Sequence, residues 1–503
     1  MITRDVVFID GVRTPFLRAQ SDFKTLTAYD LARFALGGLI SKSMLEGDQI
    51  GHLYFGNVMQ DVNTHNIARE SGLAAGIPGS VPATTISMAC ISSNMAITSA
   101  VEAIRCGRIE SAIAGGVEVL SDLPIRYKKP LRQKLVETRK YRKPADWLSI
   151  FKGLKFSDLL PEVPSISEFS TGDTMGVSGD KMAAKYGVTR QEQDAYALRS
   201  HMSAFKAAAE GMFEEEIIPV YLQESGEVIS EDNGVRGDTT MESLAALKPA
   251  FIRPHGTLTA GNSSFLTDGA SASLIMGKKF ALDNGFKPKV YIRSYSYTAR
   301  KPDDELLIGP AFAIPKALDE LGIALDDIDV FEFHEAFAGQ VLTVLKALAD
   351  QTFAKERLNR ESAVGTVPIE KLNTLGGSLS LGHPFGATGV RLLTTAANRL
   401  VREKGRYALI AACAAGGQGH AMVIERYEEE SPKRESTEAE SEKPLREGGV
   451  LDVTAVKGAN PAEMAAPAEK GDSREVVSQG SHIEEQKGVK NMEGVKEQGG
   501  GTI

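Results

Sequence analysis

Cysteine is scarce in this sequence: Cys90, Cys106 and Cys413 are the only three among 503 residues. An odd, small number without paired spacing excludes a disulfide framework and is typical of a reducing compartment, where a lone thiol more often serves chemistry than structure. Long apolar runs are also missing, so the sequence predicts no membrane-spanning helix. The formal net charge of −9 argues against nucleic acid as a partner.

The beginning of the sequence shows no targeting pattern. Met1 is followed almost at once by the apolar, β-branched run Val6–Ile9, which predicts a strand rather than a signal or transit peptide. We therefore expect a cytoplasmic enzyme, and a prokaryotic origin is the simplest interpretation.

Composition divides the chain at about residue 427. Up to that point short β-branched runs alternate with longer helical patterns and Gly-rich turns, which predicts an α/β protein. From Glu428 onward Glu, Lys, Ser, Gly and Pro dominate and aromatic residues disappear. Such a segment buries too little apolar surface to offset its ordering entropy, so we expect 428–503 to be disordered.

A faint internal repeat runs through the ordered part and favours two similar α/β halves. The first half has a helical pattern from Ala35, strand 53–56, helix 92–105 and strand 111–115; the second has a helical pattern from Ala317, strand 330–333, helix 387–400 and strand 407–412. Because any two helix–turn–strand units look alike, the repeat by itself also fits unrelated units.

The segment between the halves, 123–250, breaks this pattern. Residues 126–155 carry eleven Lys or Arg against two acidic residues, with Trp147 and Phe151 near their end. A solvated loop face is one interpretation. The other is a docking surface for a membrane, an acidic partner or the phosphates of a ligand.

Cys90 lies where a β-branched run ends and small residues open a helix near Ser92. A thiol at a helix N-terminus is expected to have a lowered pKa, because the helix dipole stabilises the nucleophilic thiolate. The alternative is a buried structural cysteine.

His383 lies in the glycine-rich stretch 373–389, which precedes a helix. It falls at the loop-to-helix position that Cys90 occupies in the first half, so the two side chains can meet if the halves pack about a pseudo-twofold axis. The glycines also suggest a phosphate-binding loop, but the Lys-Ser/Thr pair of such loops is absent.

Two further segments carry polar or thiol side chains at strand ends. Cys413 is followed by Ala414-Ala415-Gly416-Gly417, where accessible backbone N–H groups can stabilise an oxyanion. His334-Glu335 follows the predicted strand 330–333. We expect no metal there, because the spacing of a His-Glu-x-x-His site is absent.

These segments, in this order, resemble the thiolase family. The resemblance rests on the Cys90 segment, Thr259–Ala270, His334-Glu335-Ala336-Phe337, Gly382-His383-Pro384, and Cys413 with its glycines, and it extends across about 1–427. It implies two α/β halves in a five-layered αβαβα core with a loop domain. The expected division is 1–122 (completed by about 251–280), loop domain 123–250, second half 281–427 and tail 428–503.

The resemblance also implies a role for each site residue. Cys90 is the expected nucleophile, His383 its activating base, and Cys413 the acid/base at the α-carbon of acetyl-CoA. One oxyanion hole would use His383 and His334, and the other the backbone N–H groups of Cys90 and Ala415. Ser264 matches the serine that contacts the pantetheine arm. Coenzyme A is then a substrate, and no tightly bound cofactor is expected.

Two details point to a subgroup: His334 where many thiolases have Asn, and Ala415 where many have Gly. Both resemble the β subunit of the trifunctional complex of fatty-acid β-oxidation, which implies medium- to long-chain 3-ketoacyl-CoA substrates, a homodimer, and an α subunit with hydratase and dehydrogenase activities. A short-chain acetoacetyl-CoA thiolase working in the condensing direction stays open, as does a non-catalytic lipid-binding scaffold. A ketoacyl synthase is disfavoured by Cys413.

Overall fold

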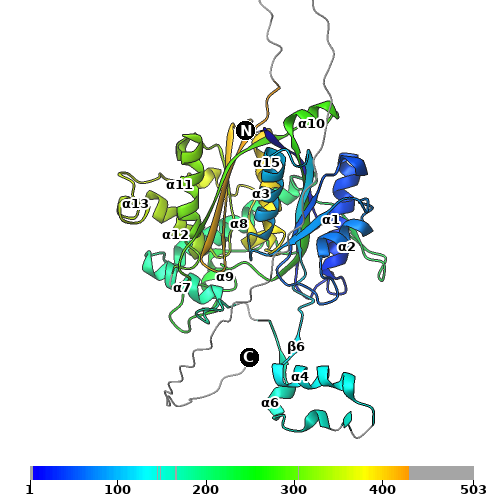
Figure 1. Ribbon diagram of the computed structural model, residues 1–503. Coiled ribbons are helices and arrows are strands. Elements are labelled where there is room, and N and C mark those ends of the chain that lie inside the picture. The colour runs from blue at the N-terminus through cyan, green and yellow to red at the C-terminus, as the bar shows by residue number, and fades with distance from the viewer. Residues whose placement is uncertain (1–3, 144–145, 148, 165–166, 304, 430–503) are drawn as a thin grey trace, which may run out of the picture. The chain divides into compact units, whose positions relative to one another are not determined.

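The computed structural model describes residues 4–143, 146–147, 149–164, 167–303 and 305–429, all within one compact unit, Met1–Ser431. Nearly all of the predicted disordered tail, 428–503, lies outside the described residues. A ten-stranded mixed sheet and the helices around it form the core (Figure 1). Among the helices of the described part of the chain, none has the length and apolar character needed to cross a membrane.

The sheet is built from two halves joined at its centre, in the order β12-β13-β14-β11-β1-β10-β5-β3-β4. The strands of the first half are β1 (Val6–Arg13), β3 (Leu53–Gly56), β4 (Ala83–Ile86), β5 (Ser111–Glu118) and β10 (Thr267–Gly277), with the short β2 (Leu17–Arg18) beside β10. Those of the second half are β11 (Val290–Ala299), β12 (Val330–Phe333), β13 (Tyr407–Ala414) and β14 (Gln418–Arg426). Only two residue pairs, Val7 with Tyr291 and Phe8 with Val290, join β1 to β11.

The register of the strands confirms the predicted duplication. In the first half β1 pairs antiparallel with β10, with an irregularity between Phe8 and Asp10. In the second half β11 pairs antiparallel with β14, with an irregularity between Ile292 and Ser294. The parallel pair β3–β5 likewise corresponds to the parallel pair β12–β13. The counterpart of β4 is reduced to a single bridge between Phe331 and Leu372.

Helices on the two faces of each half give five layers. Alternate residues of a strand face opposite sides, and both sides of these strands are apolar: in β13, Leu409 and Ala411 belong to one core cluster and Ala408 and Ile410 to another. The inner cluster contains α3 (Ser92–Arg105) and α15 (Thr388–Arg402), which lie between the half-sheets in Figure 1. The outer clusters contain α1 (Ala28–Ser43) and α2 (Ile67–Ala74) on one side, and α11 (Gly309–Leu321) and α12 (Ala338–Ala349) on the other.

Two of these helices begin earlier than the sequence pattern predicted. α1 starts at Ala28 rather than Ala35, because Thr27 and Asp30 form a capping box there. α11 starts at Gly309 rather than Ala317, with Pro310 in its first turn, where a missing N–H costs nothing. In both helices buried apolar residues already precede the predicted start, Leu31 and Ala32 in α1 and Ala311–Ile314 in α11.

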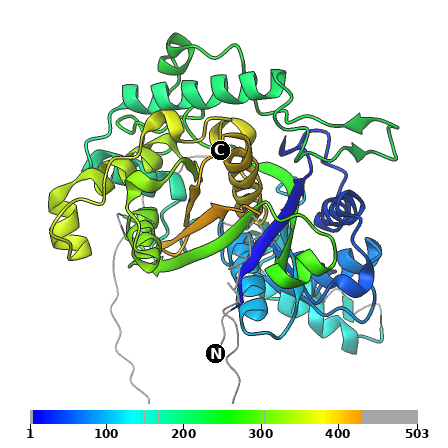
Figure 2. The ribbon, with the colours of Figure 1, turned by 90° about the horizontal axis from the view of Figure 1, so that it is seen from above.

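The region between the halves contributes helices to the second half and a separate helical segment. The long helix α8 (Arg190–Ala209), teal in Figure 2, runs along one side of the core and contacts α14 (Ser378–Leu381). The other elements of this region are β6 (Arg126–Tyr127), α4 (Lys129–Glu137), η2 (Thr138–Lys140), η3 (Ser149–Phe151), α6 (Phe156–Leu159), β7 (Pro161–Glu162), α7 (Met175–Lys185), β8 (Val220–Tyr221), β9 (Val228–Ile229) and α9 (Met241–Ala245). The remaining short elements are η1 (Gly47–Gln49), α10 (Lys278–Asp283), η4 (Leu325–Asp327), α13 (Gln351–Leu358) and η5 (Ile369–Lys371).

Candidate active site

Cys90 lies on a tight turn between β4 and α3. Ala89, just before it, has a φ of +47°, a left-handed conformation that is uncommon for a residue with a side chain. The Ser92 hydroxyl holds this turn, since it accepts from the Met88 N–H at 2.8 Å and donates to the Ala89 carbonyl at 2.7 Å. The thiol is therefore presented at the start of the helix, as the sequence predicted.

The predicted lowering of the Cys90 pKa is wrong. Burial raises the pKa of this thiol to about 12, and the negative charge of Glu118 adds to the effect. The backbone N–H groups of Ala415 and Cys90 point to the sulfur and offset only part of the shift. Desolvation outweighs the favourable end of the helix, so the resting nucleophile is a neutral thiol that needs a base.

His383 is held against the first half of the molecule. It forms a bridge with Leu266, and its backbone N–H donates to the Thr267 hydroxyl at 2.9 Å. The preceding residue, Gly382, has a φ of +107°, and a Cβ atom there would meet Thr267 Oγ1 at 2.6 Å. The glycine is needed for this close approach, which carries His383 across to the Cys90 side.

Cys90, His383 and His334 converge. The Cys90 sulfur and one ring nitrogen of each histidine lie within 4.8 Å of one another, and the two imidazole rings are 4.0 Å apart between centroids. Nδ1 of His383 contacts the Thr388 hydroxyl at 2.6 Å, and Nδ1 of His334 contacts the Ser378 hydroxyl at 3.0 Å. Both Nε2 atoms are buried and lack a hydrogen-bond partner among the described residues.

Both histidines are neutral at physiological pH. Burial, followed by the positive charge of Arg391, lowers the pKa of His383 to about 3. Burial, followed by His383 and Arg391, lowers the pKa of His334 well below its ordinary value. A neutral imidazole next to a neutral thiol can accept the thiol proton during attack, which is the arrangement of a base-assisted nucleophile.

The loop that carries His334 is fixed by Glu335. The His334 N–H donates to the Ala411 carbonyl at 2.8 Å. The fully buried Glu335 carboxylate accepts hydrogen bonds from four groups: Tyr196 Oη (3.0 Å), Ser200 Oγ (2.9 Å), Asn373 Nδ2 (2.6 Å) and the Leu379 N–H (3.1 Å). Two of these donors lie on α8, so the segment 123–250 between the halves helps to position His334.

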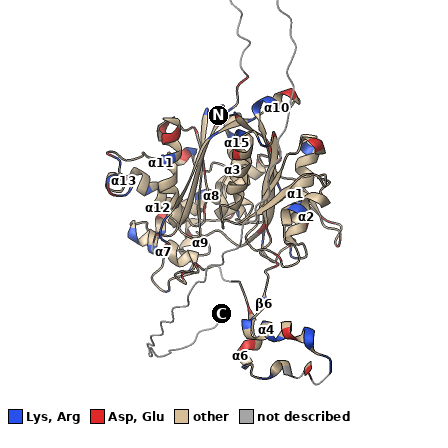
Figure 3. Ribbon diagram, viewed as in Figure 1, with Lys and Arg blue, Asp and Glu red and all other residues tan. Residues whose placement is uncertain are grey.

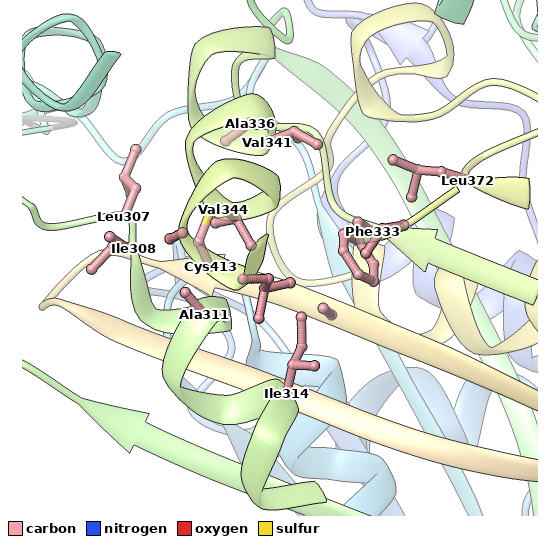
Figure 4. Close-up of a cluster of buried hydrophobic side chains, with 14 of the residues drawn as sticks. Leu307, Ile308, Ala311, Ile314, Phe333, Ala336, Val341, Val344, Leu372 and Cys413 are labelled. Atoms are coloured by element: carbon pink, nitrogen blue, oxygen red, sulfur yellow. The ribbon is translucent and has the colours of Figure 1, made fainter. Parts of the chain in front are cut away.

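Cys413 is a second thiol close to the half-buried Cys90, and it is itself buried. It lies within β13 rather than beyond it, with 1% of its surface exposed, and Figure 4 shows it beside apolar side chains of α11 and α12. Burial, followed by the charge of Cys90, raises its pKa well above that of an ordinary thiol. The strand ends in a turn in which Gly416 and Gly417 have positive φ angles of +82° and +71°.

The two remaining predicted site residues lie beside these groups. Ala415, half-buried in the same turn, directs its N–H to the Cys90 sulfur. Half-buried Ser264 donates its backbone N–H to the Ala336 carbonyl at 3.0 Å, which places it next to the His334 loop. All six predicted site residues therefore gather in one region, but their roles stay predictions.

The same site offers a set of metal ligands. One thiol and two imidazoles, Cys90, His334 and His383, are donors that zinc accepts. The sequence predicted no metal, and that expectation stays a prediction.

Sequence reasoning missed the residues that support the site: Glu118, Ser378, Thr388 and Arg391. Glu118 is fully buried at the end of β5 and accepts from the Met59 N–H at 2.8 Å and the Gly386 N–H at 3.0 Å, joining the first half to the His383 loop. Its only sequence signal is a charge that ends an apolar strand.

Comparisons with known proteins agree with this geometry. Residues 6–279 match the family model "Thiolase, N-terminal domain" and 286–426 match "Thiolase, C-terminal domain". The bovine mitochondrial trifunctional enzyme subunit beta is 50% identical over 424 residues, covering 84% of this chain and 89% of the bovine protein. A probable 3-ketoacyl-CoA thiolase of Caenorhabditis elegans is 51% identical, covering 84% and 94%. The crystal structure of human mitochondrial 3-ketoacyl-CoA thiolase in complex with CoA superposes with a TM-score of 0.73 at 30% identity, covering 85% of this chain and 99% of the human chain.

Proposed function

The chain belongs to the thiolase family, and on this premise we propose that it cleaves medium- and long-chain 3-ketoacyl-CoA to acetyl-CoA and a shortened acyl-CoA in fatty-acid β-oxidation. It is an acyltransferase that uses coenzyme A as a substrate and needs no tightly bound cofactor. The observation that carries the proposal is the meeting of Cys90, His383 and His334 within 4.8 Å.

The first half-reaction forms an acyl-enzyme. His383 takes the proton of the Cys90 thiol, and the sulfur attacks the 3-keto carbon of the substrate. Cleavage of the C2–C3 bond leaves the acyl group on Cys90 and releases acetyl-CoA as an enolate. Negative charge develops on two different oxygens in these steps, and each needs hydrogen-bond donors.

Two sets of donors suit the two oxygens. The N–H groups of Cys90 and Ala415, which point to the sulfur in the free enzyme, would bind the oxygen of the acyl group. His383, after taking the thiol proton, and His334 would bind the oxygen of the acetyl unit. Ser264, beside the His334 loop, would contact the pantetheine arm.

The proton balance of the reaction assigns a role to the second thiol, Cys413. Cys413 donates its proton to C2 of the enolate and becomes a thiolate, which then takes the proton of the incoming CoA thiol. The CoA sulfur attacks the acyl-Cys90 thioester, and the departing Cys90 sulfur recovers its proton from His383. Both cysteines and the histidine are thereby restored for the next cycle.

Thiolysis rates for 3-ketoacyl-CoA substrates of about four to sixteen carbons test the proposed chain length. Under this proposal kcat/KM rises toward the longer chains. Activity confined to acetoacetyl-CoA would retain the chemistry and assign the enzyme to short-chain metabolism.

We also propose two protein partners. Similarity to trifunctional enzyme beta subunits favours a complex with an α subunit that has hydratase and dehydrogenase activities. A homodimer is favoured by β4, a strand at the open end of the sheet whose outer edge has no partner strand among the described residues. Light scattering of the purified chain, alone and with a candidate α subunit, tests both; a monomer that does not change mass would contradict both.

We further propose that 126–155 docks on anionic membranes. Its eleven basic residues include those of α4, and Figure 3 shows Lys and Arg on this segment, which lies outside the layered core. Large apolar side chains are exposed beside the charge: Val136 is 65% exposed, Trp147 54% and Phe151 61%. Basic and apolar groups together are the usual requirement for binding at a lipid interface.

Co-sedimentation with phosphatidylglycerol vesicles tests this docking. The variant Trp147→Ser/Phe151→Ser should bind at least about 100-fold more weakly, since burying each ring contributes about 1.5–3 kcal/mol and about 1.4 kcal/mol corresponds to tenfold. Met44→Ser, at an apolar residue that is 85% exposed elsewhere on the molecule, is the matched control. Equal binding of both variants, or equal binding to neutral vesicles, would refute the docking.

A cytoplasmic location stays a proposal. It is supported by the sparse cysteines, although the bovine relative is named as mitochondrial. Fractionation of the source cells with an antibody against the chain tests it.

A further inference from the structure

We propose that Ser378 and Arg391 are positioning residues that fix His334 in the tautomer with a proton on Nε2, so that His334 donates a hydrogen bond to the substrate oxygen while His383 acts as the base. The inference rests on the proposed function for its consequence in catalysis. The tautomer of His334 itself does not depend on which substrate the enzyme uses.

The Ser378 hydroxyl has one available hydrogen-bond acceptor for its proton. Arg391 Nη2 donates to Ser378 Oγ at 3.2 Å, and a guanidinium has donors only. The other partner of this oxygen is Nδ1 of His334, at 3.0 Å. Among the described residues no other acceptor contacts the hydroxyl, so its hydrogen points to Nδ1. A neutral imidazole that accepts at Nδ1 has its own proton on Nε2.

The hydroxyl beside His383 is arranged differently. Thr388 Oγ1 lies 2.6 Å from His383 Nδ1, but it also donates to the Pro384 carbonyl at 3.0 Å. Because the Thr388 proton has its own acceptor, the oxygen can accept from an Nδ1–H group of His383. Nε2 of His383 then has the lone pair that a base requires. The two adjacent imidazoles therefore face the site with opposite hydrogen-bonding character.

Arg391 also keeps both imidazole rings uncharged. Its side chain is fully buried, 3.5 Å from Glu332, which forms a 2.7 Å ion pair with the buried Arg399. A fixed positive charge beside two imidazoles disfavours protonation of both. The roles of the two rings then depend on which nitrogen carries the single proton, and the hydroxyl contacts decide this.

Two assays separate this role from simple packing. Thiolysis needs both the base and the oxyanion donor, whereas alkylation of Cys90 by iodoacetamide needs the base but develops no oxyanion. Ser378→Ala removes the hydroxyl, and we expect its kcat for thiolysis to fall by about 10- to 100-fold while the alkylation rate of Cys90 stays within about twofold of wild type. Thr388→Val, the reciprocal variant, should lower both rates. A fall in both rates for Ser378→Ala, or in neither, would overturn the proposal.

A direct measurement is made on the wild-type protein, and a variant serves only to assign the resonance. The chain has eight histidines, so nitrogen resonances of ¹⁵N-histidine-labelled wild-type protein can be assigned, with His334→Gln identifying the site. The expected spectrum has an unprotonated Nδ1 and a protonated Nε2 on His334; the reverse would overturn the inference. A wild-type enzyme that shows this spectrum but no thiolysis would instead contradict the proposed function.

Discussion

Replacing His383 with phenylalanine should expose the intrinsic reactivity of the Cys90 thiol. The variant keeps a ring in the buried site and removes both nitrogens, so Cys90 loses its base while remaining desolvated. Burial raises the pKa of Cys90 from 9.0 to about 12, which reduces the thiolate fraction about 1,000-fold at neutral pH. A thiolate of higher pKa is more nucleophilic by about 20-fold over this interval, so the expected alkylation rate is about 50-fold below that of an unshifted thiol.

Cys106 is the comparator within the same molecule, because it is an exposed free cysteine. Iodoacetamide labelling read by peptide mass spectrometry gives both rates from one sample. Between pH 6 and 9 the Cys90 rate in His383→Phe should rise about tenfold per pH unit with no plateau, since the thiol does not approach its pKa in this range. In the wild type, Cys90 should react faster than in the variant at pH 7.

A different outcome would refute the reasoning. If Cys90 in His383→Phe reacts as fast as Cys106, or if its rate levels off below pH 8, a thiolate exists without the base. The helix N-terminus would then outweigh desolvation, as the sequence alone had predicted.

Four further predictions concern the rest of the site and chain. Cys90→Ala should lower thiolysis by about 10⁴-fold or more, since no other group can hold the acyl chain; appreciable turnover in a steady-state assay would contradict the nucleophile. Cys413→Ser should slow deuterium exchange at C2 of acetyl-CoA by about 100-fold or more and acylation of Cys90 less; intact exchange, followed by NMR, would move the acid/base role elsewhere. Removing 428–503 should leave specific activity within about twofold. Acidification from pH 6.5 to 5.5 should cost about 1 kcal/mol of unfolding free energy for each of His334 and His383. Their folded pKa values are lowered, so the stability they contribute is present above pH 6.5 and is lost as pH falls; for His383, the difference between wild type and His383→Phe in urea unfolding at the two pH values measures it.

The duplicated fold could be predicted because its signals are local. Strands 53–56 and 330–333 were predicted with the bounds that β3 and β12 have, and the helix containing 92–105 has the predicted ends. The starts of α1 and α11 were predicted too late, although a capping box and a proline mark them and buried apolar residues such as Leu31 and Ile314 precede the predicted starts. The meeting of Cys90 and His383 followed from the pseudo-symmetry, which places both at equivalent loop-to-helix positions.

The electrostatics of the site could not be predicted, because they depend on contacts between distant segments. The Cys90 sulfur is enclosed by groups as far along the chain as Ala415, and the charge that opposes its ionisation belongs to Glu118. A local feature, the helix N-terminus, was visible in the sequence, while the larger effect, burial, was not. The same reason hides Ser378 and Arg391, whose roles exist only where α14 and α15 meet β12.

The glycines around His383 illustrate how the structure decides between two interpretations of one motif. A phosphate-binding loop needs free backbone N–H groups, but the Gly386 N–H donates to Glu118 at 3.0 Å and the His383 N–H donates to Thr267 at 2.9 Å. A Cβ atom on Gly116 would meet the Gly386 carbonyl oxygen at 1.9 Å, so this glycine pair lets the His383 loop of the second half pack directly on β5 of the first. The glycines therefore serve the joint between the halves, and that joint brings the base to the thiol.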